Sequence, residues 1–275
     1  MRCIFCKQES SRTKSVEHIV PESLGNKEHV MPLGSVCDGC NNYFSIKIEK
    51  PSLEHDFFRQ QRFRNGIESK KGRIPRGKGL IPYTKSEPEI YFSKHSNKIE
   101  VNLDAESFRL IKEGQIKQMY IPMSSPLPEN VQCISRLIAK ISFEMLFLRL
   151  ARNDLETREF LIDAENLNPI RNYIRYNHKN ENWIYSVRKI YDEDERFYLG
   201  SGKSVDMVFE CDFLYTKQME LYFIIAFKGV EFAINMAGDS IEGYQKWLTD
   251  NNNISPLYAN GKHFGYKLIP EFLKK

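Results

Sequence analysis

The feature that most restricts how this chain can fold is a pair of Cys-x-x-Cys units near its start. Cys3 and Cys6 form the first unit, and Cys37 and Cys40 form the second. Each unit can place two thiolates on one zinc ion, and two units complete a tetrahedral four-sulfur site. Because four sulfurs leave no position for water or substrate, the spacing predicts that the zinc ion is structural.

A Glu-His pair lies between the two units, and two asparagines follow the second unit. Glu17 and His18 belong to residues 16–20, Val-Glu-His-Ile-Val, whose alternation is typical of a short strand. Asn41 and Asn42 lie at the start of a stretch that favours a helix. A purely structural zinc site explains neither the Glu-His pair nor the asparagines.

The N-terminal segment therefore resembles the HNH endonuclease family, in the version whose ββα-metal hairpin is held by a zinc ribbon. The residues that carry the resemblance are Cys3, Cys6, Glu17, His18, Ile19, Pro21, Gly25, Cys37, Cys40 and Asn41. The resemblance is confined to this segment and says nothing about the rest of the chain.

The resemblance implies that His18 is the general base and that Glu17 and Asn41 bind a catalytic Mg²⁺ or Mn²⁺. A neutral imidazole is a suitable base near neutral pH, and a divalent cation can stabilise the leaving oxygen of a phosphodiester. Carboxylate and amide oxygens are the hard ligands that Mg²⁺ prefers. Adjacent strand residues point to opposite faces, so the resemblance requires a bend or a strand end at Glu17 and His18.

Some positions depart from the family pattern. Pro32 stands where the family usually has its central asparagine, and Asn26 is the nearest substitute. Asn42 competes with Asn41 for the last position of the motif, but Asn41 directly follows the cysteine. His29 is a second histidine in the hairpin loop and is expected at the surface. Asn26, His29 and Asn42 are therefore supporting candidates.

A basic stretch from Arg59 to Gly79 follows the cysteine-rich segment. The candidate nucleic-acid contacts in it are Arg59, Arg62, Arg64, Lys70, Lys71, Arg73 and Arg76. Cationic side chains that neutralise phosphates drive sequence-independent binding to nucleic acid. The alternative is a solvated linker between domains, and the sequence leaves both interpretations open.

The remainder of the chain predicts one long helix and an antiparallel sheet. Apolar residues recur at three- and four-residue steps from Glu129 to Arg152, which is typical of an amphipathic helix. Arg136 and Lys140 lie one turn apart on this helix and are expected at the surface. A shorter helix is expected over residues 164–176, and the helix after the second cysteine unit is expected to end at Pro51.

Strand-length runs of β-branched and aromatic residues dominate from Trp183 onward, with short connections that imply antiparallel neighbours. Residues 89–103 favour two further strands. Residues 200–204, Gly-Ser-Gly-Lys-Ser, favour a hairpin turn, and residues 254–275 favour an edge strand. The predicted fold class is α+β: a zinc-bound ββα-metal module followed by a domain with an antiparallel sheet and a long amphipathic helix.

The predicted organisation is a nuclease module over residues 1–55, a basic linker or DNA-contacting arm over residues 56–80, and an accessory domain of unknown role over residues 81–275. Net charge is +4, which by itself does not indicate nucleic acid. The absence of a membrane-length apolar run and of an apolar signal core predicts a cytoplasmic protein.

The function implied by the resemblance is metal-dependent hydrolysis of phosphodiester bonds, with DNA favoured over RNA as the substrate. Relatives of this family also suggest a role in restriction or phage defence. Two alternatives stay open. One is a non-catalytic zinc ribbon that binds nucleic acid or a partner protein. The other is a nuclease held silent by a C-terminal domain that senses a ligand. The sequence leaves a homo-oligomer and a partner protein equally open.

Overall fold

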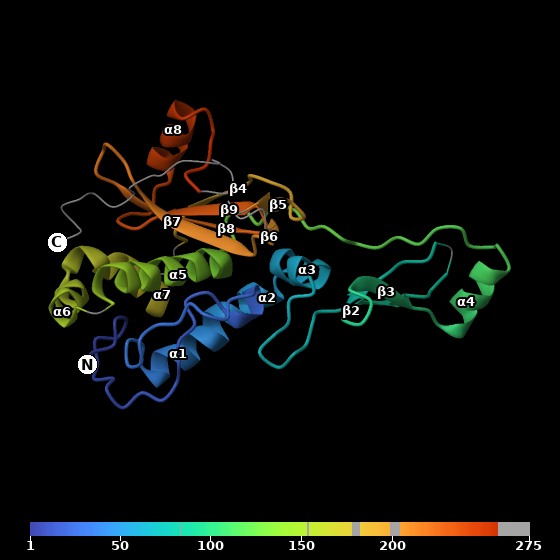
Figure 1. The fold of residues 1–275 in the computed structure, drawn as a ribbon, viewed down its shortest axis with the longest axis horizontal. Helices are drawn as coiled ribbons and strands as arrows, with labels where there is room; N and C mark the ends of the chain where they lie inside the picture. The colour runs from blue at the N-terminus through green and yellow to red at the C-terminus, as the bar shows by residue number, and fades with distance from the viewer. Residues whose placement is uncertain (83, 153, 178–181, 199–203, 258–275) are drawn as a thin grey trace. The chain divides into compact units, whose positions relative to one another are not determined.

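The computed structural model describes residues 1–82, 84–152, 154–177, 182–198 and 204–257 (Figure 1). Helices and antiparallel sheets occupy separate stretches of the chain, which confirms the predicted α+β class. Among the described residues, no helix combines the length and the apolarity needed to cross a lipid bilayer.

The chain forms two compact units, each assembled from separate stretches of sequence. Unit 1 comprises Met1–Val20, Glu28–Ser52 and Leu127–Lys275, and unit 2 comprises Pro21–Lys27 and Leu53–Pro126. The cysteine-rich segment therefore belongs mainly to the same compact unit as the C-terminal half. The predicted division at residues 55 and 80 concerns sequence modules and stays a prediction.

A four-stranded antiparallel sheet is the centre of unit 1. Its strands, in the order β4-β9-β8-β7, are β4 (Tyr185–Lys189), β9 (Val230–Asn235), β8 (Leu221–Phe227) and β7 (Phe209–Tyr215). Ile224 in β8 lies opposite Asp212 in β7 and Ala233 in β9. The four strands expected after Trp183 are thereby confirmed.

A separate two-stranded ribbon, β5 (Arg196–Tyr198) and β6 (Ser204–Asp206), lies in the connection between β4 and β7. The turn predicted at residues 200–204 and the edge strand predicted in the tail fall mostly outside the described residues.

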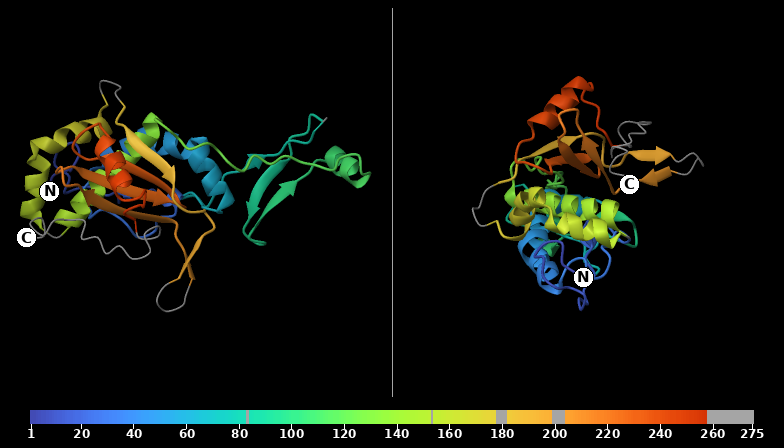
Figure 2. Two further views of the ribbon diagram at one scale, coloured as in Figure 1. Left: turned by 90° about the horizontal axis from the view of Figure 1, so that it is seen from above. Right: turned by 90° about the vertical axis from the view of Figure 1, so that its left-hand side faces the viewer.

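The two faces of this sheet bury different partners. Helix α8 (Glu242–Asp250) covers one face, where Tyr222 and Ile224 share a buried cluster with Tyr244. Since side chains alternate along a strand, their neighbours point to the other face, which packs on helix α5 (Gln132–Ala151). Figures 1 and 2 show the sheet between these two helices. The long helix is therefore the layer that joins the sheet to the N-terminal segment.

Helix α5 is buried on nearly every side, and this overturns one expectation. Arg136 and Lys140 were expected at the surface, but both are buried, and Lys140 is fully enclosed. The reason is that α5 has the sheet on one side and helices α6 (Leu155–Asp163), α7 (Asn168–Arg175) and the N-terminal segment on the others. Its polar face is therefore an internal interface.

The helix predicted over residues 164–176 is present as the 3₁₀ turn η3 (Glu165–Leu167) and α7, with Pro169 in the first turn of α7. Proline is tolerated there because the first N–H groups of a helix have no intrahelical partner. Helix α6 was not predicted.

The helix that follows the second cysteine unit does not end at Pro51 as expected. Helix α1 (Asp38–Phe44) continues into η2 (Ser45–Glu49), which is π-helical, and then into α2 (Lys50–Glu54). Pro51 lies at the second position of α2, directly after the π-helical stretch. A π-bulge changes the local hydrogen-bond pattern, so the missing proline N–H does not terminate the helix.

Unit 2 consists of a three-stranded antiparallel sheet and short helices. Its elements are η1 (Glu22–Leu24), α3 (Asp56–Arg64), β1 (Gly77–Lys78), β2 (Glu89–Ser93), β3 (Lys98–Asn102) and α4 (Ala105–Lys112), with strand order β1-β2-β3. The two strands expected within residues 89–103 are confirmed as β2 and β3. Asp104 caps α4 by accepting a 2.8 Å hydrogen bond from the Ser107 amide.

Candidate metal centre

The four cysteines of the two Cys-x-x-Cys units converge on one point. Their Sγ atoms all lie within 4.8 Å of one another, and none of the four forms a disulfide. A zinc–sulfur bond of about 2.3 Å places tetrahedral sulfurs about 3.8 Å apart. The separation of 3.6 Å between Cys6 and Cys37 agrees with this geometry. The donor set therefore fits a structural zinc ion.

Backbone amides and neighbouring thiols form hydrogen bonds with these sulfurs and change their pKa values. The amide of Cys37 donates to Cys3 Sγ at 3.4 Å, and the amide of Cys40 donates to Cys37 Sγ at 3.4 Å. A hydrogen bond from the Cys40 thiol lowers the pKa of Cys3 to about 5 and raises the pKa of Cys40. Burial raises the pKa of Cys6 to about 11. Zinc binds thiolates, so its binding has to displace the protons of the thiols whose pKa is raised.

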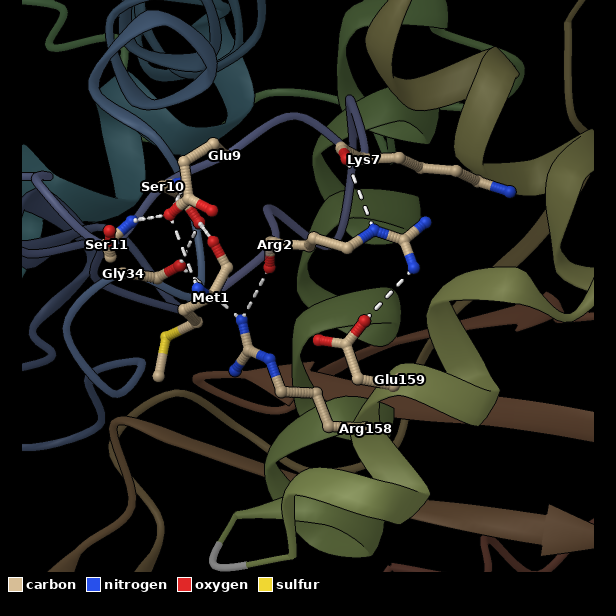
Figure 3. Close-up of polar contacts among 9 residues, drawn as sticks. All are labelled: Met1, Arg2, Lys7, Glu9, Ser10, Ser11, Gly34, Arg158 and Glu159. Carbon is tan, nitrogen blue, oxygen red and sulfur yellow. Dashed lines mark hydrogen bonds and ion pairs between the residues drawn. The ribbon is translucent and has the colours of Figure 1, made fainter.

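Arginines of α6 and α7 form hydrogen bonds with the cysteine-rich segment. Arg175 Nε donates to Cys40 Sγ at 3.2 Å, and Arg171 Nε donates to the Ile4 carbonyl at 2.9 Å. Arg158 donates to the Arg2 carbonyl at 2.9 Å, as Figure 3 shows. Zinc with four thiolates carries a net charge of −2, so these guanidinium groups offset the charge of the centre. Burial lowers the pKa of Arg171 to about 10.

The hairpin that carries the Glu-His pair is very short. His18 pairs with Val30 in an isolated antiparallel bridge, flanked by a 3.1 Å bond from Ile19 N to His29 O and a 2.9 Å bond from Met31 N to Glu17 O. A bend follows directly at Ile19, so the extended segment ends at the Glu-His pair, as the resemblance requires. Glu17 is buried and His18 is half-buried.

Glu17 faces inward and contacts the buried ammonium group of Lys140. The same ammonium lies 3.0 Å from Glu49 and 3.2 Å from Glu144, and it donates to the His18 carbonyl at 3.0 Å. We call these four side chains, Lys140 with Glu17, Glu49 and Glu144, the Lys140 cluster. It joins the predicted catalytic strand to α5 and η2.

The Lys140 cluster perturbs the acid–base properties of its members. Burial by itself would lower the pKa of Lys140, but the three carboxylates outweigh it, and the pKa is raised. Burial raises the pKa of Glu17 and raises that of Glu144 well above its ordinary value. Lys140 therefore stays protonated, with its ammonium group next to Glu17.

The asparagines and His29 have different environments. Asn41, in the first half of α1, donates from Nδ2 to the Val16 carbonyl at 3.2 Å, so this helix is tied to the strand of His18. Asn42 and His29 are exposed. The His29 ring meets the edge of Phe209 at a centroid distance of 5.5 Å. Asn26 is buried and belongs to unit 2.

The seven basic candidates do not share one environment. Arg62 is buried in α3, and burial lowers its pKa. Arg64 donates to the Met123 carbonyl. The other five, Arg59, Lys70, Lys71, Arg73 and Arg76, are exposed. The structure therefore separates two basic residues that are engaged within unit 2 from five that face solvent.

Sequence reasoning missed the Lys140 cluster entirely. Lys140 lies 123 residues from Glu17 in the sequence, so no local pattern links them. The available signal is that Arg136, Lys140 and Glu144 lie in a helix whose apolar residues extend beyond one stripe, with Phe143 and Phe147 beside the charged positions. A helix with that pattern is expected to be buried, and buried charges are expected to be paired.

Comparison with known proteins identifies the class of the N-terminal segment. Residues 3–57 match the family model of the HNH endonucleases, and this confirms the resemblance carried by the cysteines, the Glu-His pair and Asn41. The match covers about a fifth of the 275 residues. No curated protein matches the chain, and no solved structure does. A nuclease-family function is thereby supported.

Proposed function

We propose that this protein is a metal-dependent endonuclease that hydrolyses DNA phosphodiester bonds, with His18 as general base. The observation that carries the proposal is the HNH family match over residues 3–57, together with the four-cysteine centre in the same segment. His18 is half-buried, and the proposal requires that water and a phosphate group reach its imidazole. An imidazole in this position accepts the proton of the attacking water.

The predicted ligands of a catalytic Mg²⁺ or Mn²⁺ fit only in part. Asn41 supports the role, because its amide nitrogen is the group that bonds to Val16 and an amide oxygen is a suitable magnesium ligand. Glu17 does not fit, because the buried Lys140 ammonium contacts its carboxylate and would repel a divalent cation. No step of the reaction is therefore derived through this metal, and the Glu17 and Asn41 ligand pair stays a prediction.

The chain's own residues perform three tasks in the proposal. His18 moves the proton, and the hydrogen bond from Lys140 to the His18 carbonyl fixes the strand that carries it. The four cysteines hold zinc, which orders the segment that presents His18 and Asn41. A DNA substrate, and a role in restriction or phage defence, follow from the family and complete the proposal.

Conversion of supercoiled plasmid to nicked and linear DNA tests the function directly. Purified protein is incubated with Mg²⁺ or Mn²⁺ beside its His18→Ala variant, and zinc content is measured on both. The proposal expects cleavage by the wild type and a loss of about 10²–10⁴ in rate for the variant. Equal cleavage by the two proteins would reject His18 as the general base, and no cleavage by the wild type would favour the non-catalytic zinc-ribbon alternative.

The ligand-sensing alternative gains support from a cavity in unit 1. The cavity has a volume of about 600 Å³, and its lining includes Tyr173, Trp183, Asn172, Asn182 and Asp239. Aromatic faces beside amide groups suit a small planar molecule that forms hydrogen bonds. Titration of adenosine against the tryptophan fluorescence tests this, with plasmid cleavage measured at saturation. No change in either signal would count against a nucleoside sensor.

A further inference from the structure

A hollow of about 530 Å³ lies in unit 2, beside the hairpin of β2 and β3. We call it the hairpin pocket. Its lining residues are Gly72, Arg73, Ile74, Arg76, Tyr91, Phe92 and Lys94. The first four belong to the basic stretch that sequence alone left between a phosphate-contacting arm and a solvated linker. A volume of this size falls within the range of pockets that hold small ligands, roughly 300–1,000 Å³.

The charge of the hairpin pocket is one-sided. Its lining contains three cations and no carboxylate. Arg73 has no ion-pair partner among the described residues, whereas Arg76 lies 2.8 Å from Glu89 and Lys94 lies 2.5 Å from Glu68. These two ion pairs are exposed, and exposed pairs are weak. A phosphate group entering the pocket can therefore compete for all three cations.

An aromatic face accompanies the cations. The Arg76 guanidinium lies 6.0 Å from the centre of the Tyr91 ring, and the Tyr91 hydroxyl donates to Glu100 at 2.8 Å, which fixes the outer end of the ring. Phe92 is held by a close approach to Gly66, where an added Cβ would lie 2.6 Å from the Phe92 ring. The two aromatic residues of the pocket lining are thus held in place, Tyr91 by Glu100 and Phe92 by its packing against Gly66.

We propose that the hairpin pocket binds one nucleotide of a single-stranded DNA segment, with its phosphate on Arg73, Arg76 and Lys94 and its base on Tyr91. Cationic grooves with aromatic platforms are the means by which proteins bind unpaired strands, because every base offers a π-face. A base within a duplex is already stacked on its neighbours and cannot offer that face. The choice of DNA rests on the proposed nuclease function.

Fluorescence anisotropy of labelled oligonucleotides tests this proposal on the full chain. The background is His18→Ala, which keeps the DNA intact, in buffer without added Mg²⁺ or chelator. Tyr91→Leu should weaken binding of a dT oligonucleotide by about 5- to 150-fold, the effect of losing one base stack, and Tyr91→Phe should bind like the background protein. Arg73→Ala should flatten the slope of log affinity against log salt by about 0.7 for single-stranded DNA.

Matched controls come from the same unit. Tyr120 and Arg109 are exposed residues of unit 2 outside the pocket lining, so Tyr120→Ala and Arg109→Ala should leave affinity and slope unchanged. Thermal unfolding of each variant establishes that it is folded. The proposal is overturned if Tyr91→Leu binds as well as Tyr120→Ala, or if its loss is confined to a duplex of the same length.

The outcome is separable from that of the nuclease proposal. Loss of binding in Tyr91→Leu without any cleavage by the wild type would keep the pocket and reject the nuclease. Cleavage that depends on His18, with no effect of Tyr91→Leu on binding, would keep the nuclease and reject the pocket.

Discussion

The side chains of Glu17 and His18 are neighbours in the sequence but occupy different environments. Glu17 lies in the Lys140 cluster with almost no exposed surface, while His18 is half-buried. We therefore expect the two adjacent residues to have separable tasks. In the proposal the carboxylate helps to fix the strand, and the imidazole takes part in the chemistry.

The imidazole is the residue whose removal should affect reaction rate alone. His18→Ala should lose about 10²–10⁴ in cleavage rate because a positioned base is removed. Zinc content should not change, because the four sulfurs that fit zinc do not include His18. Metal analysis and plasmid cleavage on the same preparation check both statements. His95→Ala, at an exposed position outside residues 3–57, is the matched control and should retain wild-type activity.

We expect Lys140 to contribute to the stability of the folded protein. Lys140→Met leaves the buried carboxylates of Glu17 and Glu144 and the partly buried carboxylate of Glu49 without their cation, and breaking a buried ion pair typically costs about 3–5 kcal/mol. Urea unfolding should show this loss. The same substitution at exposed Lys246 should change the free energy of unfolding by less than about 0.5 kcal/mol.

A double-mutant cycle distinguishes the two roles of Glu17. If Glu17 pairs with Lys140, Glu17→Gln and Lys140→Met should not be additive in stability, because both remove the same contact. If Glu17 instead binds the catalytic metal, Glu17→Gln should be as stable as wild type and should regain activity at high Mn²⁺. If the stability losses of the two single substitutions simply add in the double variant, Glu17 does not stabilise the protein through Lys140.

Single-residue predictions succeeded where the chemistry is local. The two cysteine units sufficed to predict a four-sulfur site, because the spacing within each unit sets the geometry. The environment of Glu17 depends on a lysine in a distant helix. A lysine on a helix surface looks the same in sequence whether that surface meets water or another segment, so Lys140 was assigned to solvent.

Helix α7 supplies none of the four sulfurs but contacts one of them directly. Arg175 donates to the sulfur of Cys40, and groups that hydrogen-bond to metal ligands typically change metal affinity by about 10–100-fold when removed. Arg175→Ala should weaken zinc binding by that factor, measured by competition with a chromophoric chelator. Arg12→Ala, an exposed arginine on the N-terminal segment, should leave zinc affinity unchanged.

Element types were predictable from periodicity, but their ends depended on tertiary context. The strands β4, β7, β8 and β9 and the helix α5 follow from apolar patterns over long stretches. Helix α6 lacks a clear pattern, with Phe160 largely exposed and Arg158 buried, so periodicity gave no signal. Pro51 predicts a helix end, whereas the helix continues past it after the π-helical stretch.

At the scale of the whole molecule, unit 1 is discontinuous in sequence. The Phe5 ring packs against Phe44 at 4.5 Å and against Phe143 of α5 at 5.2 Å between ring centroids. A fragment of residues 1–55 with zinc would expose these rings, so it should not reach the native fold. Dispersion of amide signals in NMR spectra checks this against the full chain. A well-dispersed spectrum from the fragment would show that the zinc module is independent of α5.

No local pattern predicts such a division. Periodicity and motif spacing report on neighbouring residues, whereas membership of a compact unit is set by contacts between distant segments. The sequence therefore predicted modules in chain order, and the structure assigns residues 1–52 largely to the same unit as α5. The hairpin pocket was hidden for the same reason, since its basic and aromatic residues come from different stretches of unit 2.

The interleaved chain path also determines what is exposed while the protein is being made. Residues 1–52 leave the ribosome well before α5, which starts at residue 132, and the intervening residues 53–131 take roughly 4–16 s to translate at about 5–20 residues per second. During that interval unit 2 becomes complete, because its last residue is Pro126. The nascent chain meanwhile presents four thiols whose covering helices do not yet exist, so zinc supply and translation speed together govern how long this reactive intermediate persists.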